Sequence, residues 1–212
     1  MKKSQAARRI PCASLLFGAL AVVVYSFPAL AEALQYDRTA VLGGELWRIA
    51  TCHWTHWSLD HLLWDLAVFV GLGAACEQMN RSRYLACLAA SAILIPVAVL
   101  VWLPDMEAYR GLSGLDSALF ALLATPILAE KLKERSWGWV TLGVGFFVGF
   151  LLKTAYELAT GATVFVSSPT DIASVPLAHA VGALMGMLLS WWTPRTSATT
   201  PWASAPRRLS SA

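Results

Sequence analysis

Two polar residues of this chain lie near the start of apolar segments and carry the side chains of a nucleophile and its base. Ser113 follows Gly111-Leu112 and precedes Gly114 at the mouth of one segment, and His179 lies early in another. Hydroxyl and imidazole groups are costly inside a membrane, so those that persist usually serve function or satisfy a backbone group. A serine within hydrogen-bond reach of a histidine is the arrangement of nucleophilic hydrolases. The pair therefore predicts hydrolytic chemistry near a membrane surface.

Small residues line the helix faces that carry the serine and the histidine. They are Ser113, Ser117 and Ala121 with Gly114 and Ala118 on the first segment, and Ala178, Gly182 and Gly186 on the second. Faces of this kind let two membrane helices approach closely. Close approach is what brings a hydroxyl to within about 2.6–3.2 Å of an imidazole. The spacing therefore predicts that the two segments pack directly against each other.

The composition is that of a multi-span membrane protein. Of the 212 residues, 57% are hydrophobic and 14% are charged, which excludes an ordinary soluble domain. No basic run with interleaved aromatic residues indicates nucleic-acid binding. Six apolar stretches, each near the roughly 20 residues that a span requires, lie at about 10–31, 58–78, 84–103, 112–130, 137–156 and 174–192. The predicted fold is all-α, a polytopic bundle of six transmembrane helices.

The positions of lysine and arginine predict the orientation. With the N-terminus inside, twelve of these residues fall on the inner side and four on the outer side, the outer ones being Arg38, Arg48, Arg110 and Lys153. An inner excess predicts that both termini are cytoplasmic. Ser113 and His179 then enter the membrane from the same, outer side. This shared side favours a catalytic pair over the alternative, in which Ser113 caps a helix and His179 is a satisfied polar core residue.

Three parts of the chain are expected. Residues 1–31 form an N-terminal cytoplasmic tip and a first helix, although Ala29-Leu30-Ala31 before Glu32 also resembles a signal cleavage site. We expect the helix to be retained, because a polytopic bundle needs an orienting first span. Residues 32–192 form the core, opening with a Trp-rich outer loop to about residue 57 that suits the membrane interface. Residues 193–212, rich in Ser, Thr, Pro and Ala, are expected to be disordered.

The remaining ionisable residues and the cysteines are explained by structural roles. His61 and Asp65 are four apart and share a helix face. The spacing of His53, His56 and His61 is not the paired histidine motif of zinc helices, so no metal is expected. The cysteines, which are Cys12, Cys52, Cys76 and Cys87, have no paired spacing and are expected to be small packing residues. Lys153 and Glu157 are expected to form an interfacial pair at the outer end of the fifth span.

Taken together, the motifs resemble the rhomboid family of intramembrane serine proteases. They are Gly-Leu-Ser-Gly at 111–114, Ala-His-x-x-Gly-x-x-x-Gly at 178–186, His-x-x-x-x-His at 56–61 and Trp-Arg at 47–48. The resemblance covers about residues 43 to 192. It implies a six-helix bundle with Ser113 as nucleophile and His179 as general base and then acid, with no cofactor. It also implies that His61, Asp65 and the Ser113 N–H stabilise the oxyanion beside the Gly111 turn, and that His56 is structural.

Two positions depart from the family pattern. Asp65 stands where the family usually has Asn; an ionised Asp repels an oxyanion, so Asp65 serves only if protonated or by orienting His61. Ser117 stands where the prototype has a tyrosine stacked on the histidine. Asp116 is then a candidate third member of a triad, the alternative being a bond to a neighbouring backbone group. With these departures, the chain resembles the rhombosortase branch of the family, whose members process C-terminal anchors of exported bacterial proteins.

The expected function is hydrolysis of a peptide bond in a membrane-anchored protein, near the outer boundary of a bacterial inner membrane. Water must reach Ser113, so a cavity open to the outer side is predicted. One alternative is an inactive rhomboid relative that binds or escorts membrane proteins. Another is a transporter or channel that uses Asp65, Asp116 and Lys153. A transport path should cross the bilayer, whereas these residues cluster toward the outer half.

Overall fold

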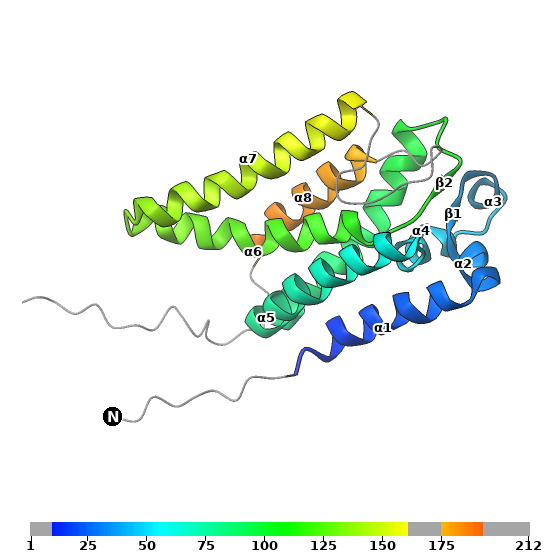
Figure 1. Cartoon of the computed structure of the whole chain (residues 1–212), viewed down its shortest axis with the longest axis horizontal. Coiled ribbons are helices and arrows are strands. Elements are labelled where there is room, and N and C mark those ends of the chain that lie inside the picture. Colours follow the sequence, from blue (N-terminus) through cyan, green and yellow to red (C-terminus); the bar gives the residue numbers. More distant parts are fainter. Residues whose placement is uncertain (1–9, 161–174, 193–212) are drawn as a thin grey trace, which may run out of the picture.

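The computed structural model describes residues 10–160 and 175–192, which form a helical bundle with one very short β-ladder (Figure 1). The helices are α1 (Cys12–Ser26), α2 (Pro28–Leu34), α3 (Arg38–Leu42), α4 (Trp47–Thr51), the 3-10 turn η1 (Cys52–Trp54), α5 (Leu59–Trp102), α6 (Ser113–Lys133), α7 (Trp137–Thr160) and α8 (Pro176–Ser190). Strand β1 (Tyr36–Asp37) pairs antiparallel with β2 (Ala108–Tyr109). The N-terminal tip before residue 10 lies outside the described residues. So does the tail from residue 193, which was predicted to be disordered.

Helix α5 is two helices joined at a break. Asn80 has φ −159° and ψ 97°, which is not helical, and it separates 59–79 from 81–102. The two limbs lie side by side, because a Cβ on Gly73 of the first limb would be 3.4 Å from the Tyr84 hydroxyl of the second. Helical segments therefore occur at each of the six predicted stretches.

The predicted number of six spans is not confirmed. By length and hydropathy, two helices of the described residues qualify as spans, Leu59–Trp102 and Trp137–Glu157. The first predicted span is bent by 115° between α1 and α2. If this bent pair is counted as a single span, the described residues contain three spans. Helix α8 has 15 residues, fewer than the roughly 20 that a straight span needs.

Helices α6 and α8 pack with their backbones in contact, as the small-residue faces predict. A Cβ added to Gly182 would collide with the carbonyl oxygen of Gly114, and one added to Gly186 would collide with that of Ala118. A Cβ on Gly114 would in turn lie 3.3 Å from the carbonyl oxygen of Ala178. Only glycine permits this approach, which aligns the starts of the two helices.

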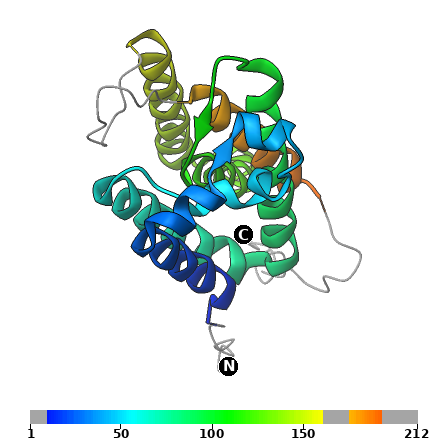
Figure 2. The ribbon, with the colours of Figure 1, turned by 90° about the vertical axis from the view of Figure 1, so that its right-hand side faces the viewer.

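The Trp-rich segment predicted to lie at the interface is folded onto one end of the bundle. Elements α2, α3, α4, β1 and β2 gather at this end, where α6 and α8 begin (Figure 1), and they stand in front of the bundle in the end-on view of Figure 2. Arg48 donates to the carbonyl oxygens of Glu32 and Gln35 at 2.8 and 3.0 Å. Arg110 donates to the Gln35 side chain at 2.7 Å. These arginines tie the segment to the loop before α6.

Helix α1 is bound to α5 by a buried carboxylate. Glu77 is 6% exposed and accepts hydrogen bonds from Ala13 N at 3.1 Å and from Ser14 N at 2.9 Å. It also accepts from the Ser14 hydroxyl at 2.9 Å. A carboxylate on the first N–H groups of a helix satisfies donors that have no intrahelical partner. Removal of α1 by signal cleavage would strip Glu77 of these partners, so retention remains our expectation.

Candidate active site

Ser113 is the first residue of α6 and is half-buried. The N-cap residue is Leu112, and no side chain caps the helix start. Within the described residues the Ser113 hydroxyl makes no hydrogen bond, so its oxygen is not engaged in the capping role that was the alternative interpretation. The hydroxyl is therefore available to act as a nucleophile.

The turn before Ser113 requires a glycine. Gly111 has φ +119°, a conformation that side chains disfavour. A Cβ at this position would lie 2.8 Å from Nε2 of His61 and 3.2 Å from Oδ2 of Asp65. The turn, the imidazole and the carboxylate thus pack against one another directly beside the candidate nucleophile.

Asp65 accepts hydrogen bonds at the centre of this cluster. Its Oδ2 atom accepts from Leu112 N at 2.8 Å, and it lies 3.2 Å from His56 Nε2 and 3.3 Å from His61 Nε2. Three potential donors converge on one oxygen, which suits a carboxylate acceptor. Of the two roles left open by the sequence, this geometry favours orientation of His61 over donation to an oxyanion.

His53 also holds the Gly111 turn, and its sequence position did not reveal this. The ring is fully buried, with Nε2 3.1 Å from the carbonyl oxygen of Ala92 and Nδ1 3.4 Å from that of Gly111. Burial lowers the pKa of His53 to about 4, so the ring is neutral at physiological pH. Burial also lowers the pKa of His56, opposed by the nearby Asp65. Both histidines are therefore structural supports of the turn.

His179 is linked to Ser113 through Ser117. Nδ1 of His179 lies 3.1 Å from the Ser117 hydroxyl oxygen, and that hydroxyl donates to the Ser113 carbonyl oxygen at 2.9 Å. A hydroxyl has one hydrogen; with that hydrogen on the Ser113 carbonyl, we assign the ring proton to Nδ1, which then donates to Ser117. This leaves Nε2 as the basic nitrogen of the neutral ring. A direct hydrogen bond between the Ser113 hydroxyl and His179 is absent among the described residues.

Asp116 does not contact the His179 ring in the described part of the chain. Its Oδ1 atom is buried and lacks a hydrogen-bond partner there. The other interpretation was that Asp116 bonds a neighbouring backbone group, and the described residues include no such bond either. Among the described residues, a carboxylate within 4 Å of the ring comes instead from α7, where Oε2 of Glu157 lies 3.7 Å from Nε2. Within the described residues, the acid beside the His179 ring is therefore Glu157 of α7, and the predicted role of Asp116 stays a prediction.

A comparison with known protein families gives one match. The model of the Rhomboid domain matches residues 43–196, which is more than half of the chain. The chain belongs to the rhomboid family. No curated protein matches it significantly. As a rhomboid protein it is an integral membrane protein of a family that acts on membrane proteins within the bilayer. Most rhomboid proteins are serine proteases and some are inactive.

The rhomboid motif residues lie together in the structure. The Gly111–Gly114 turn, His56 and His61 with Asp65, and His179 with Gly182 meet where α5, α6 and α8 adjoin. Among the described residues, no group of three His, Cys, Asp or Glu side chains has the arrangement of a metal site. Two residues beside these motif residues, His53 and Glu157, lie outside the motifs. In the sequence they stand out only as ionisable residues next to apolar segments.

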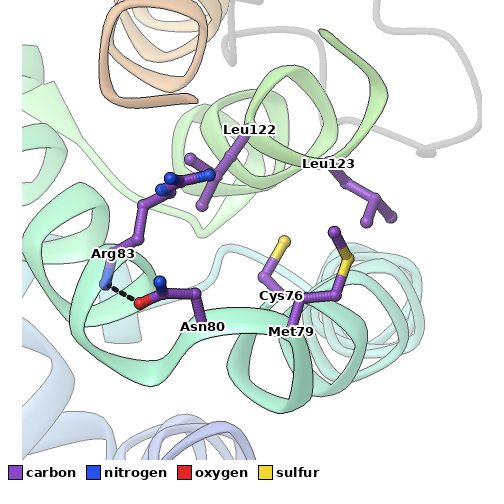
Figure 3. Close-up of a pocket in the computed structure, with 6 residues that line it drawn as sticks. All are labelled: Cys76, Met79, Asn80, Arg83, Leu122 and Leu123. Carbon is purple, nitrogen blue, oxygen red and sulfur yellow. Dashed lines mark hydrogen bonds between the residues drawn. The ribbon is translucent and has the colours of Figure 1, made fainter. Parts of the chain in front are cut away.

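A separate small cavity lies far from this rhomboid site. It has a volume of about 20 Å³ and is lined by Cys76, Met79, Asn80, Arg83, Leu122 and Leu123. Figure 3 shows it between the break in α5 and the middle of α6. Leu122 is nine residues beyond Ser113, which is about 13 Å along a helix. A space of this size holds about one water molecule, so it is no substrate site.

Proposed function

We propose that this rhomboid protein is an intramembrane serine protease that uses Ser113 as its nucleophile and His179 as its general base. The observation that carries the proposal is the hydrogen-bonded path from the Ser113 carbonyl through Ser117 to Nδ1 of His179. This path leaves Nε2 without a proton. His179 and Ser113 both lie near the starts of their helices, at the same end of the bundle. A base in that tautomer is ready to accept the serine proton.

The proposed reaction proceeds in two stages. The Ser113 oxygen attacks the carbonyl carbon of the scissile bond while its proton passes to Nε2 of His179. The carbonyl becomes an oxyanion, which the Ser113 N–H and His61 stabilise. The C–N bond then breaks and the leaving amine takes the proton from His179. A water molecule, activated by the same imidazole, releases the acyl group from Ser113.

Asp65 supports the oxyanion site indirectly in this proposal. Its contacts with Leu112 N and His61 hold the turn and the imidazole in place without requiring a proton on the carboxylate. The departure from the usual asparagine is then compatible with activity, because Asp65 faces the backbone rather than the substrate.

The proposed setting is a bacterial inner membrane with the site toward the outer side and both termini in the cytoplasm. The inner excess of lysine and arginine supports this orientation. The substrate is a membrane-anchored protein cut in or next to its anchor. The departures at Asp65 and Ser117 favour a rhombosortase-type substrate with a C-terminal anchor.

Cleavage of a model membrane-anchored substrate tests the proposal. Wild type, Ser113→Ala and His179→Ala are compared in proteoliposomes, with Ser190→Ala as a matched control. Ser190 is a buried serine of α8 whose hydroxyl donates to the carbonyl oxygen of Met187 at 2.7 Å, away from Ser113. We expect wild type and Ser190→Ala to cleave and to react with a fluorophosphonate, and both site variants to do neither. Cleavage that persists in Ser113→Ala contradicts the proposal.

An inactive escort protein is the second candidate. The absence of a hydrogen bond between the Ser113 hydroxyl and His179 within the described residues favours it. In that case wild type binds the anchored substrate in pull-down but neither cleaves it nor reacts with the fluorophosphonate.

A further inference from the structure

Glu157 is a buried acid on a helix that the rhomboid motifs do not include. Its side chain is 2% exposed, and its Oε1 atom accepts from Lys153 Nζ at 2.7 Å. Its second oxygen, Oε2, lies 3.7 Å from Nε2 of His179. The Lys153–Glu157 pair predicted from the sequence is therefore present, but one member points inward to the candidate base rather than lying at the interface.

One group beside the His179 ring, the Glu157 carboxylate, favours the protonated form of the ring. On one side Nδ1–H donates to Ser117, whose own hydrogen is used on the Ser113 carbonyl. On the other side Nε2 faces a carboxylate oxygen. A neutral ring offers this anion no charge to pair with, whereas an imidazolium carries a positive charge that Glu157 attracts. Glu157 therefore attracts the charge that His179 carries after Ser113 has lost its proton, and Lys153 opposes this attraction.

We propose that Glu157 is a positioning residue that stabilises the imidazolium of His179 during acylation. The inference rests on the proposed function and assigns the acidic partner to α7 rather than to Asp116 on α6. At 3.7 Å the contact in the resting protein is electrostatic rather than a hydrogen bond. Such an interaction is strong where water is excluded, and Glu157 is almost fully buried.

Other charges around His179 decide the sign of the expected effects. Lys153 and Glu157 act on the ring from α7, and Asp65 acts on it from α5. Helix α6 presents the neutral Ser117 to the ring and carries the buried Asp116 one residue earlier. Phe150 of α7 contacts the ring edge-on, with centroids 6.5 Å apart. Neutralising Glu157 or Lys153 therefore changes the local charge in opposite directions without touching Ser113 or Ser117.

The rate of fluorophosphonate labelling of Ser113 as a function of pH tests the proposal. In this reaction the Ser113 oxygen forms a bond to phosphorus, fluoride leaves, and His179 takes the proton. We expect Glu157→Gln to lower the maximal rate roughly ten- to a hundredfold. The inflection on the acid side should move to lower pH, because the imidazolium loses a stabilising anion. Lys153→Met should move the same inflection to higher pH.

The control is Glu134→Gln, which removes the acid of a second Lys–Glu pair at the opposite end of α6, where Lys131 Nζ and Glu134 Oε2 are 2.7 Å apart. It should leave the rate and the inflection unchanged. If Glu157→Gln lowers thermal stability in detergent, Glu157→Asp decides, because it keeps the carboxylate: a labelling rate and inflection equal to those of Glu157→Gln overturn the proposal. A faster rate in Glu157→Gln overturns it as well. An active Ser113→Ala instead removes the proposed function itself, so the two failures are distinguishable.

Discussion

The carboxylate of Asp65 accepts a hydrogen bond from the backbone N–H of Leu112 at 2.8 Å, across 47 residues of sequence. Leu112 is the N-cap of α6, so this bond fixes the direction in which Ser113 leaves the turn. The same oxygen contacts His56 and His61. One acidic side chain of α5 therefore holds together the loop, the turn and the candidate oxyanion histidine.

Replacing Asp65 should separate its acceptor role from its charge. Asp65→Asn keeps an acceptor for Leu112 N–H, so we expect substrate cleavage to stay within roughly tenfold of wild type. Asp65→Ala leaves a buried N–H without a partner, which costs about 1–3 kcal/mol, and cleavage should fall about a hundredfold. Cleavage assays and thermal unfolding in detergent measure both effects. Asp105→Ala, at an exposed aspartate, is the control; equal cleavage by Asp65→Ala and wild type contradicts the role.

Ser117→Ala should impair the base without unfolding the protein. The variant removes the acceptor for Nδ1–H of His179, and the ring loses both its orientation and its tautomer preference. A hydrogen bond of this kind contributes about 1 kcal/mol, so cleavage is expected to fall about five- to tenfold while the melting temperature changes little. Ser117→Thr, which keeps the hydroxyl, should recover part of the activity. Full activity in Ser117→Ala would mean that the ring is held by other contacts.

Gly111→Ala and Gly44→Ala should differ although both glycines have positive φ. Gly44 has φ +106° and open space around a Cβ, so alanine there introduces backbone strain of about 1–2 kcal/mol alone. At Gly111 the same strain comes with a Cβ 2.8 Å from His61 Nε2. We expect Gly111→Ala to lose cleavage and more thermal stability, and Gly44→Ala to cleave normally. Equal losses in the two variants would show that strain, not collision, is responsible.

His53 should make the protein less stable in acid. Its pKa is about 4 in the folded protein, against an ordinary value of 6.5, because the ring is buried. Between these values the unfolded chain binds a proton that the folded chain does not, so stability falls as the pH drops from 6.5 to 4. The loss is about 3 kcal/mol and levels off below pH 4.

Thermal unfolding in detergent between pH 4 and 7 checks this expectation. His53→Gln removes the titrating group while keeping a donor for Ala92, so its melting temperature should fall less steeply with acid. Some slope should persist, because burial lowers the pKa of His56 as well. Identical slopes in wild type and His53→Gln would assign the acid sensitivity to other groups.

The local sequence pattern was sufficient to predict the helices and the close contact of α6 with α8. Apolar runs near 112–130 and 174–192 predicted helices where α6 and α8 occur, within a few residues. The small residues Gly114, Gly182 and Gly186 predicted the contact face, because a helix repeats its face every three to four residues. The four-residue spacing of His61 and Asp65 likewise predicted their contact, which is 3.3 Å. Each of these inferences uses a periodicity within one helix.

The amino-acid sequence by itself therefore determined the helical segments, the family motifs and which end of the bundle carries Ser113 and His179. Only the tertiary structure decided which side chains surround them. Asp116 is three residues from Ser113 yet lacks contact with the described His179 ring, whereas Glu157 and Ser117 reach it. The bend between α1 and α2 and the burial of His53 were equally hidden. The physical reason is that the rotation and crossing of neighbouring helices depend on packing across the whole bundle, which no spacing within one helix encodes.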